Sequence, residues 1–144
     1  MENSYYRVMA LDYGDVRIGI ALSDITRFLA SGLENYTRVS LEADCNHIAE
    51  LIANNNVKVV VLGLPLNMDG TSGVRVEKTK EFAEELKKYT DAKIDFLDER
   101  LTSVSAEKIL ISADVSRKKR KQVLDKLSAT IILQDYLDTN YRKI

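Results

Sequence analysis

Residues 7–22 have the sequence RVMALDYGDVRIGIAL, and this stretch decides the fold of the 144-residue chain. Its first part, Arg7 to Leu11, is a short apolar run of the kind that forms a buried strand. Four polar or turn-forming residues follow, Asp12 to Asp15, and the chain is again largely apolar from Val16 to Leu22. The pattern predicts two antiparallel strands joined by a turn at residues 12–15.

The rest of the chain alternates between predicted helices and strands. The expected elements are a strand near 34–39, a helix capped by Ser40, a strand at 57–62, a helix through Val76 and Leu86, a strand at 94–97, a helix capped by Thr102, and a last helix at about 123–138. This order predicts a mixed sheet flanked by helices, in an α/β or α+β domain. We expect one domain over residues 1–144, because no repeat, low-complexity tract or linker divides the chain.

Composition argues against several classes of site. Cys45 is the only cysteine, so no internal disulfide is possible, and its helical register with apolar residues predicts burial. His47 is the only histidine, which argues against a histidine-built zinc site and a Ser-His-Asp triad. It lies off the apolar stripe of its helix, so we expect it to face solvent.

Charge and hydropathy bear on location and partners. The net charge is −1, from 21 basic and 22 acidic residues, so any nucleic-acid binding must come from local clusters. No apolar run reaches the ~18 residues needed to cross a bilayer, and no export signal is visible. We therefore expect a cytoplasmic protein that does not bind membranes.

Three acidic residues are candidates for a metal site. Asp12 follows the first strand, Glu99 follows a later strand, and Asp125 precedes small and apolar residues on one face of the last helix. Acids at such positions also serve as turn formers or favour a helix dipole. Three inward carboxylates without a histidine base suit hard divalent cations, which can activate water against a phosphodiester. The pattern therefore favours a nuclease.

Four segments together resemble the motifs of the YqgF/RuvX family of Holliday junction resolvases. They are LDYGDVRIGIALSD at 11–24, GLPLNMDGT at 63–71, DERLTS at 98–103, and DKLSA at 125–129 followed by ILQDYL at 132–137. The motifs occur in the family order and span nearly the whole chain. Ser128 and Thr130 depart from the family pattern, which usually has small apolar residues there.

The resemblance implies an RNase H-like fold, an α/β domain with a mixed five-stranded sheet flanked by helices. It implies a nuclease with Asp12, Glu99 and Asp125 as catalytic acids and as ligands of Mg²⁺ or Mn²⁺. Asp98 and Glu99 should lie on opposite faces of their strand, so only one can point at the site, and the family favours Glu99.

The resemblance also implies the partners. Family members are associated with Holliday junction cleavage and with maturation of the 5′ end of 16S ribosomal RNA. The expected substrate is therefore nucleic acid, either branched DNA or precursor ribosomal RNA. Cleavage of a four-way junction would suit a two-fold homodimer with two active sites.

Several polar and basic residues are candidates for substrate contacts. The glycine-containing loop at 63–73 is not a P-loop, but its backbone N–H groups could hold a phosphate. The basic run at 117–121 is either a solvated connection or a phosphate-steering element next to Asp125. The candidate substrate-binding residues are Arg17, Asn67, Thr71, Arg100, Arg117, Lys118, Lys119 and Lys121.

Two other functions compete with the nuclease. The Asp12–Gly14–Gly19 pattern also resembles the first phosphate loop of sugar kinases, actin and heat-shock ATPases, but those proteins need two lobes to enclose a nucleotide. A non-catalytic ribosome-assembly factor could recognise folded RNA by its shape. Clustered acids near phosphates argue against a pure binding module.

Overall fold

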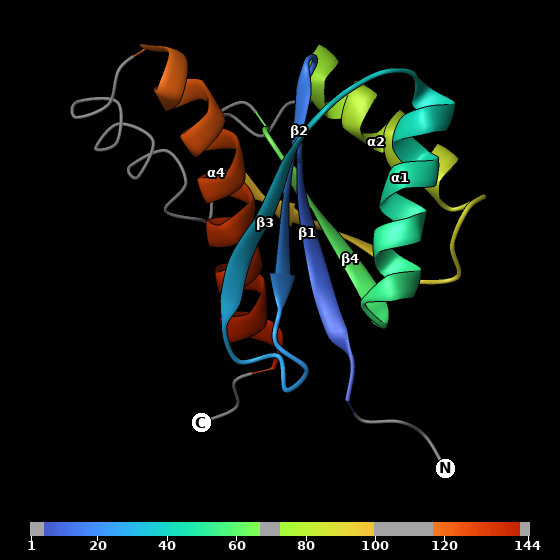
Figure 1. Ribbon diagram of the computed structural model, residues 1–144, viewed down its shortest axis with the longest axis vertical. Helices are drawn as coiled ribbons and strands as arrows, with labels where there is room; N and C mark the ends of the chain where they lie inside the picture. The colour runs from blue at the N-terminus through green and yellow to red at the C-terminus, as the bar shows by residue number, and fades with distance from the viewer. Residues whose placement is uncertain (1–4, 67–72, 100–116, 142–144) are drawn as a thin grey trace.

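A computed structural model describes residues 5–66, 73–99 and 117–141, with residues 117–126 described by their backbone alone (Figure 1). Its elements are β1 (Arg7–Tyr13), β2 (Arg17–Ser23), β3 (Ala30–Thr37), α1 (Leu41–Asn54), β4 (Val57–Leu64), α2 (Val74–Leu86), β5 (Lys93–Asp98) and α4 (Arg117–Asn140). The five strands form one sheet in the order β3-β2-β1-β4-β5. β1 pairs antiparallel with β2 and parallel with β4, which confirms the predicted mixed sheet.

The sheet separates two helical layers. Helices α1 and α2 cover one face, and α4 covers the other (Figure 1). Because successive residues of a strand point to opposite faces, β1 contributes Met9 and Leu11 to the α1/α2 side and Val8 and Ala10 to the α4 side. Among the described residues, no helix is both long and apolar enough to cross a lipid bilayer.

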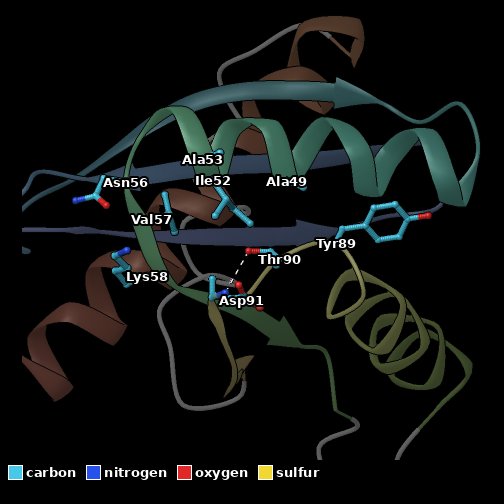
Figure 2. Close-up of a pocket in the computed structure, with 10 residues that line it drawn as sticks. Ala49, Ile52, Ala53, Asn56, Val57, Lys58, Tyr89, Thr90 and Asp91 are labelled. Carbon is cyan, nitrogen blue, oxygen red and sulfur yellow. Dashed lines mark hydrogen bonds between the residues drawn. The ribbon is translucent and has the colours of Figure 1, made fainter.

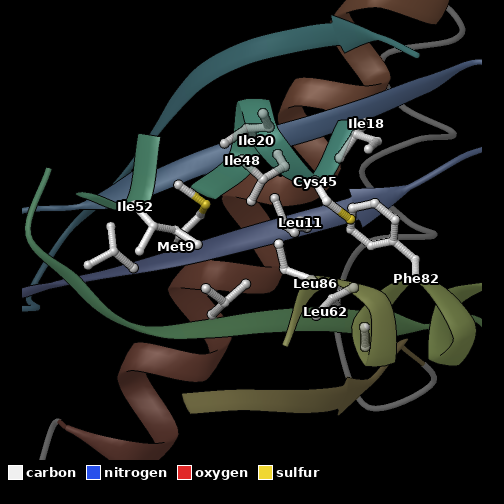
Figure 3. Packing of buried hydrophobic residues seen from close by; sticks show 13 residues of the cluster. Met9, Leu11, Ile18, Ile20, Cys45, Ile48, Ile52, Leu62, Phe82 and Leu86 are labelled. Carbon is white, nitrogen blue, oxygen red and sulfur yellow. The ribbon is translucent and has the colours of Figure 1, made fainter. Parts of the chain in front are cut away.

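The core between the sheet and helices α1 and α2 is built from apolar side chains (Figure 3). Its thirteen buried residues are Met9, Leu11, Ile18, Ile20, Cys45, Ile48, Ile52, Val57, Val60, Leu62, Phe82, Ala83 and Leu86. The burial of Cys45 confirms the sequence prediction, and this burial raises the pKa of its thiol to about 11. The cysteine therefore acts as an apolar core residue.

The turn between β1 and β2 fits the predicted hairpin. The Gly14 N–H donates to the Arg17 carbonyl at 3.0 Å, which closes the turn. A Cβ at Gly14 would lie 2.7 Å from that same carbonyl oxygen, so the tight turn requires glycine here. β1 extends to Tyr13 and pairs Asp12 with Gly19, so Asp12 lies inside the strand rather than after it.

Two predicted boundaries were wrong. β3 begins at Ala30 rather than near Glu34, because its first residues pair with β2 beyond a bulge at Ile20/Ala21. α4 begins at Arg117 rather than near Val123, since lysine and arginine are good helix formers and the basic run joins the helix. The helix predicted after Thr102 lies outside the described residues.

Candidate functional site

Asp12 lies near the carboxyl end of β1, on the side of the sheet that α4 covers. Val8 and Ala10 pack against α4, and Asp12 shares their face by strand alternation. The β1–β4 register pairs Leu11 with Leu62, which brings Asp12 level with Gly63 on the neighbouring strand. The carboxylate is half-buried, and its antiparallel partner Gly19 has no side chain to cover it.

Glu99 directly follows β5 and approaches the same position from the other side. The β4–β5 register pairs Gly63 with Leu97, two residues before Glu99. A Cβ at Gly63 would lie 3.1 Å from the Glu99 Cγ and 3.2 Å from its Cδ. The carboxyl group of Glu99 therefore packs over the backbone of Gly63, one strand away from Asp12.

Asp98 takes the opposite orientation. It pairs with Leu64, and the alternating residues before it, Ile94 and Phe96, pack against the α1/α2 core. Alternation therefore puts Asp98 on the α1/α2 side, while Glu99 is on the α4 side. Of these two adjacent acids, Glu99 is the one on the same side as Asp12.

Gly63 makes this arrangement sterically feasible. A Cβ at this position would also meet the Cδ1 atom of Ile132 in α4 at 2.7 Å. The sequence predicts a loop that begins at Gly63, but Gly63 lies within β4, between β1 and β5. A glycine at the end of a central, otherwise apolar strand was the signal that could have identified it.

Helix α4 runs antiparallel to β1 across this face. The Tyr6 and Tyr141 hydroxyls, 3.3 Å apart, join the end of α4 to the start of β1, while Ile132 lies against Gly63. Asp125 precedes Ile132 by seven residues, so its backbone lies about 10 Å further along the helix, toward the carboxyl edge. The side chain of Asp125 is outside the described residues.

Two other polar groups on the α4 side lack hydrogen-bond partners within the described parts of the chain. Arg17 shares its face of β2 with Ala21, and its Nη1 atom is buried without a partner. Ser128 of α4 is fully buried, and its Oγ atom is also unsatisfied. Buried polar groups are normally satisfied, so these two atoms have the capacity to bind a polar ligand on the α4 side.

The remaining predicted substrate residues are only partly covered by the structure. Asn67, Thr71 and Arg100 lie outside the described residues. The backbone of the basic run at 117–121 forms the first turns of α4, which corrects the prediction of a connection before the helix. The first turn of α4 contains no acidic residue, so basic charge adds to the positive end of the helix dipole.

The prediction that His47 faces solvent was wrong. Its ring stacks on Tyr36 with centroids 4.3 Å apart, and its Nε2 atom lies 2.9 Å from a Glu34 carboxylate oxygen. The side chain is only 31% exposed. His47 therefore links α1 to β3, far from the two acids on the other side of the sheet.

A separate cavity of about 400 Å³ lies at the opposite edge of the sheet (Figure 2). It is bordered by the end of α1, the start of β4, and residues 89–92 before β5. Within it, the Ala92 N–H donates to the Thr90 hydroxyl at 3.1 Å. None of the predicted site residues lines this cavity.

The donor set on the α4 side fits a hard divalent cation. Asp12 and Glu99 supply carboxylate oxygens, and the absent Cβ of Gly63 leaves the space that brings Glu99 close. Within the described residues no group of three or more potential metal ligands is found, and the third predicted ligand, Asp125, is outside them. The described pair is thus compatible with the predicted metal chemistry.

Solved structures of similar shape identify the class of fold. Thermus thermophilus RuvC in complex with a Holliday junction substrate matches with a TM-score of 0.60 and 10% identity, over 96% of this chain and 98% of that one. The fowlpox virus resolvase in complex with Holliday junction DNA matches with a TM-score of 0.56 and 13% identity, over 94% and 99% of the two chains. The domain therefore has the RNase H-like fold of these resolvases.

Sequence comparison gives the family. The family model for RuvX, described as Holliday junction resolvase, matches residues 6–139, and the chain belongs to this family. A relative from Carboxydothermus hydrogenoformans is 52% identical over 94% of this chain and 97% of its own length. One from Halalkalibacterium halodurans is 49% identical over 95% and 99%. Both carry the name "Putative pre-16S rRNA nuclease".

Proposed function

We propose that this chain is a divalent-metal-dependent endonuclease that hydrolyses phosphodiester bonds in structured nucleic acid. The observation that carries the proposal is the placement of Asp12 and Glu99 on one side of the sheet, on either side of Gly63, in a chain of the RuvX family. The names of its relatives favour precursor 16S ribosomal RNA as the substrate. Branched DNA is the second candidate, because the family is described as Holliday junction resolvase.

Asp12, Glu99 and Asp125 would hold Mg²⁺ or Mn²⁺ in this proposal. Carboxylate oxygens are the protein ligands that these cations prefer. When bound, such ions polarise the phosphoryl group and lower the pKa of water, so that hydroxide is available at neutral pH. Gly63 contributes by leaving room for the Glu99 carboxylate against the backbone of β4.

The basic groups of the chain are proposed to bind and orient the phosphate backbone. The buried, unsatisfied Nη1 of Arg17 can donate a charge-assisted hydrogen bond to a phosphate oxygen. Lys118, Lys119, Lys121 and Arg117, at the positive end of α4, attract the polyanion toward the acids. Asn67, Thr71 and Arg100 complete the proposed set of substrate contacts.

The same proposal includes the cellular location, the extent of the domain and the oligomeric state. A nuclease of precursor ribosomal RNA works in the cytoplasm, as a single nuclease domain over residues 1–144. On a four-way junction, two copies related by a two-fold axis would cut two symmetric strands. Sizing of the protein with and without junction DNA tests that dimer.

A cleavage panel tests the proposed activity. It offers junction DNA, single-stranded RNA and precursor 16S RNA with Mg²⁺, Mn²⁺ or chelator, to the wild-type protein and to Asp12→Asn. Asp15→Asn is the matched control, because it removes the same charge from an exposed side chain of the same hairpin. We expect metal-dependent cutting by wild type and by the control, and none by Asp12→Asn. Cleavage in chelator, or full activity of Asp12→Asn, would contradict the proposal.

A further inference from the structure

Arg38, which directly follows β3, contacts the turn next to Asp12. Its Nη1 atom donates to the carbonyl oxygens of Gly14 and Asp15, each at 3.3 Å. Its guanidinium carbon lies 4.6 Å from the centre of the Tyr13 ring. The side chain therefore touches the three consecutive residues that follow Asp12.

The backbone of Arg38 adds another link to the same hairpin. Its N–H donates to the Val16 carbonyl at 2.9 Å. Both Asp15 and Val16 are exposed, so the tip of the hairpin has little packing of its own. Arg38 and the exposed Lys78–Asp15 pair both hold this tip from outside the hairpin.

Asp44 of α1 fixes the orientation of Arg38. Its Oδ2 atom accepts from the Arg38 Nε at 3.0 Å. Its Oδ1 atom accepts from the Val39 N–H and the Tyr36 hydroxyl, both at 2.9 Å. The Asp44 side chain is fully buried, whereas that of Arg38 is 22% exposed. A buried carboxylate with three donors leaves Arg38 one favourable position.

These contacts keep Asp44 charged. Burial alone would raise its pKa, but the hydrogen bonds from the Val39 N–H, Arg38 and Tyr36 outweigh burial and lower the pKa. The Asp44 carboxylate therefore stays ionised at neutral pH. Loss of Arg38 would leave this buried charge without its ion-pair partner.

Tyr13 connects this pair to the geometry of Asp12. The Tyr13 ring contacts both the Arg38 guanidinium and the Phe82 ring, whose centroid is 4.6 Å away. Tyr13 points to the α1/α2 side, and its neighbour Asp12 points to the α4 side. A clamp on Tyr13 and on the turn therefore sets the direction of the Asp12 side chain on the opposite face.

We propose that Arg38, oriented by Asp44, is a positioning residue that holds the hairpin of Asp12 in the geometry needed for hydrolysis. The inference rests on the nuclease function proposed above. Arg38 also borders a cavity of about 430 Å³ with Asp15, Lys78 and Glu81, where its charge could instead meet substrate. Its Nε and Nη1 atoms are already used within the protein, which favours the positioning role.

The test uses Arg38→Lys, which keeps the charge but loses the planar fork that reaches Asp44 and both carbonyls. His47→Ala is the matched control, because His47 also joins α1 to β3 but does not contact the hairpin. We expect kcat of Arg38→Lys to fall about tenfold or more, since small errors in position slow catalysis strongly. KM should stay within about twofold, because positioning does not alter uniform substrate binding. His47→Ala should melt at a lower temperature and keep its kcat.

Amide hydrogen exchange gives a readout that does not depend on activity. The Gly14 amide should exchange about tenfold faster in Arg38→Lys than in wild type, because Arg38 binds the carbonyls of the turn that this amide closes. In His47→Ala its exchange rate should be unchanged. If Arg38→Lys does not fold, Asp44→Asn serves as the second variant, with the same pattern expected.

Two results for Arg38→Lys would overturn the inference. A raised KM with an unchanged kcat would make Arg38 a substrate contact. A lower melting temperature with unchanged kcat and unchanged exchange of the Gly14 amide would make its role purely structural. If the wild-type protein cuts no substrate, the proposed function fails, and the exchange measurement alone decides whether Arg38 holds the hairpin.

Discussion

The two faces of the sheet have different compositions, although the same strands build both. The α1/α2 face buries a cluster of thirteen apolar residues, and its helices add the buried polar residues Asp44 and Thr79. The α4 face buries ten, and toward the carboxyl edge its packing gives way to Asp12, Arg17 and Glu99. Leu11 and Asp12, adjacent in β1, belong to the two different faces.

This difference separates the apolar packing that stabilises the fold from the edge that carries the proposed site. Half-buried carboxylates close to one another are unfavourable without a cation, because their charges repel. The apolar cluster on the opposite face holds the strands in register and offsets that cost. The strands can therefore carry charged groups at one edge without loss of the fold.

The largest effect on stability is expected from Leu11→Ala on the apolar face. Leu11 is fully buried, so its loss should lower the free energy of unfolding by about 2–5 kcal/mol. Turnover per folded molecule should remain close to that of the wild type, because the side chain points away from the acids. Urea denaturation measures the free energy of unfolding, and kinetics normalised to the concentration of folded protein measure the turnover. A loss of turnover without a loss of stability would refute the division between the faces.

The next largest effect is expected from Gly63→Ala on the face that carries the proposed site. The new methyl group would collide with the Glu99 carboxyl group and with Ile132, so Glu99 must move. Displacement of a catalytic group by about 1 Å can slow turnover on the order of 100-fold. Steady-state kinetics and a thermal melt measure the result.

The control for Gly63→Ala is Val60→Ile, in the same strand but on the apolar face. Overpacking there should cost about 1–3 kcal/mol of stability and leave turnover unchanged. If both variants slow turnover equally, the effect comes from general strain in β4 and not from Glu99.

A smaller effect is expected from the basic start of α4. Replacement of Lys118, Lys119 and Lys121 by alanine should weaken substrate binding about tenfold at low salt and flatten its salt dependence. Turnover at saturating substrate should change little, because uniform binding does not lower the chemical barrier. Replacement of Lys80, Lys87 and Lys88, exposed residues at α2, removes equal charge from the other face and should not change the salt slope. Equal effects of the two triple variants would show that only net charge matters.

Local sequence patterns predicted most of the strands and helices. The β1–β2 hairpin and the N-cap of α1 depend on neighbours in the chain, and the Ser40 hydroxyl does accept from the Ala43 N–H at 3.1 Å. The start of α4 was misjudged because the basic run was interpreted as a segment before the helix, although lysine and arginine are good helix formers. Pairing with β2, which sequence periodicity does not reveal, sets the start of β3.

The site was less predictable because tertiary contacts build it. Asp44 lies in the first turn of α1, where an acid commonly favours the helix dipole, yet it is buried and binds Arg38 and Tyr36. Those partners come from the preceding strand, and their approach depends on how α1 packs on the sheet. The approach of Glu99 to Gly63 likewise depends on the β4–β5 register, which no single segment encodes.

Mn²⁺-dependent thermal melts of wild type and Asp12→Asn test most directly whether Asp12 is a metal ligand. For wild type, Mn²⁺ at about 100 times its dissociation constant should add about 2.7 kcal/mol of stability. In chelator, Asp12→Asn should be as stable as wild type or more stable, because one of two repelling charges is gone. Its stabilisation by Mn²⁺ should be lost. The central claim is contradicted if Asp12→Asn is destabilised in chelator yet keeps the full stabilisation by Mn²⁺.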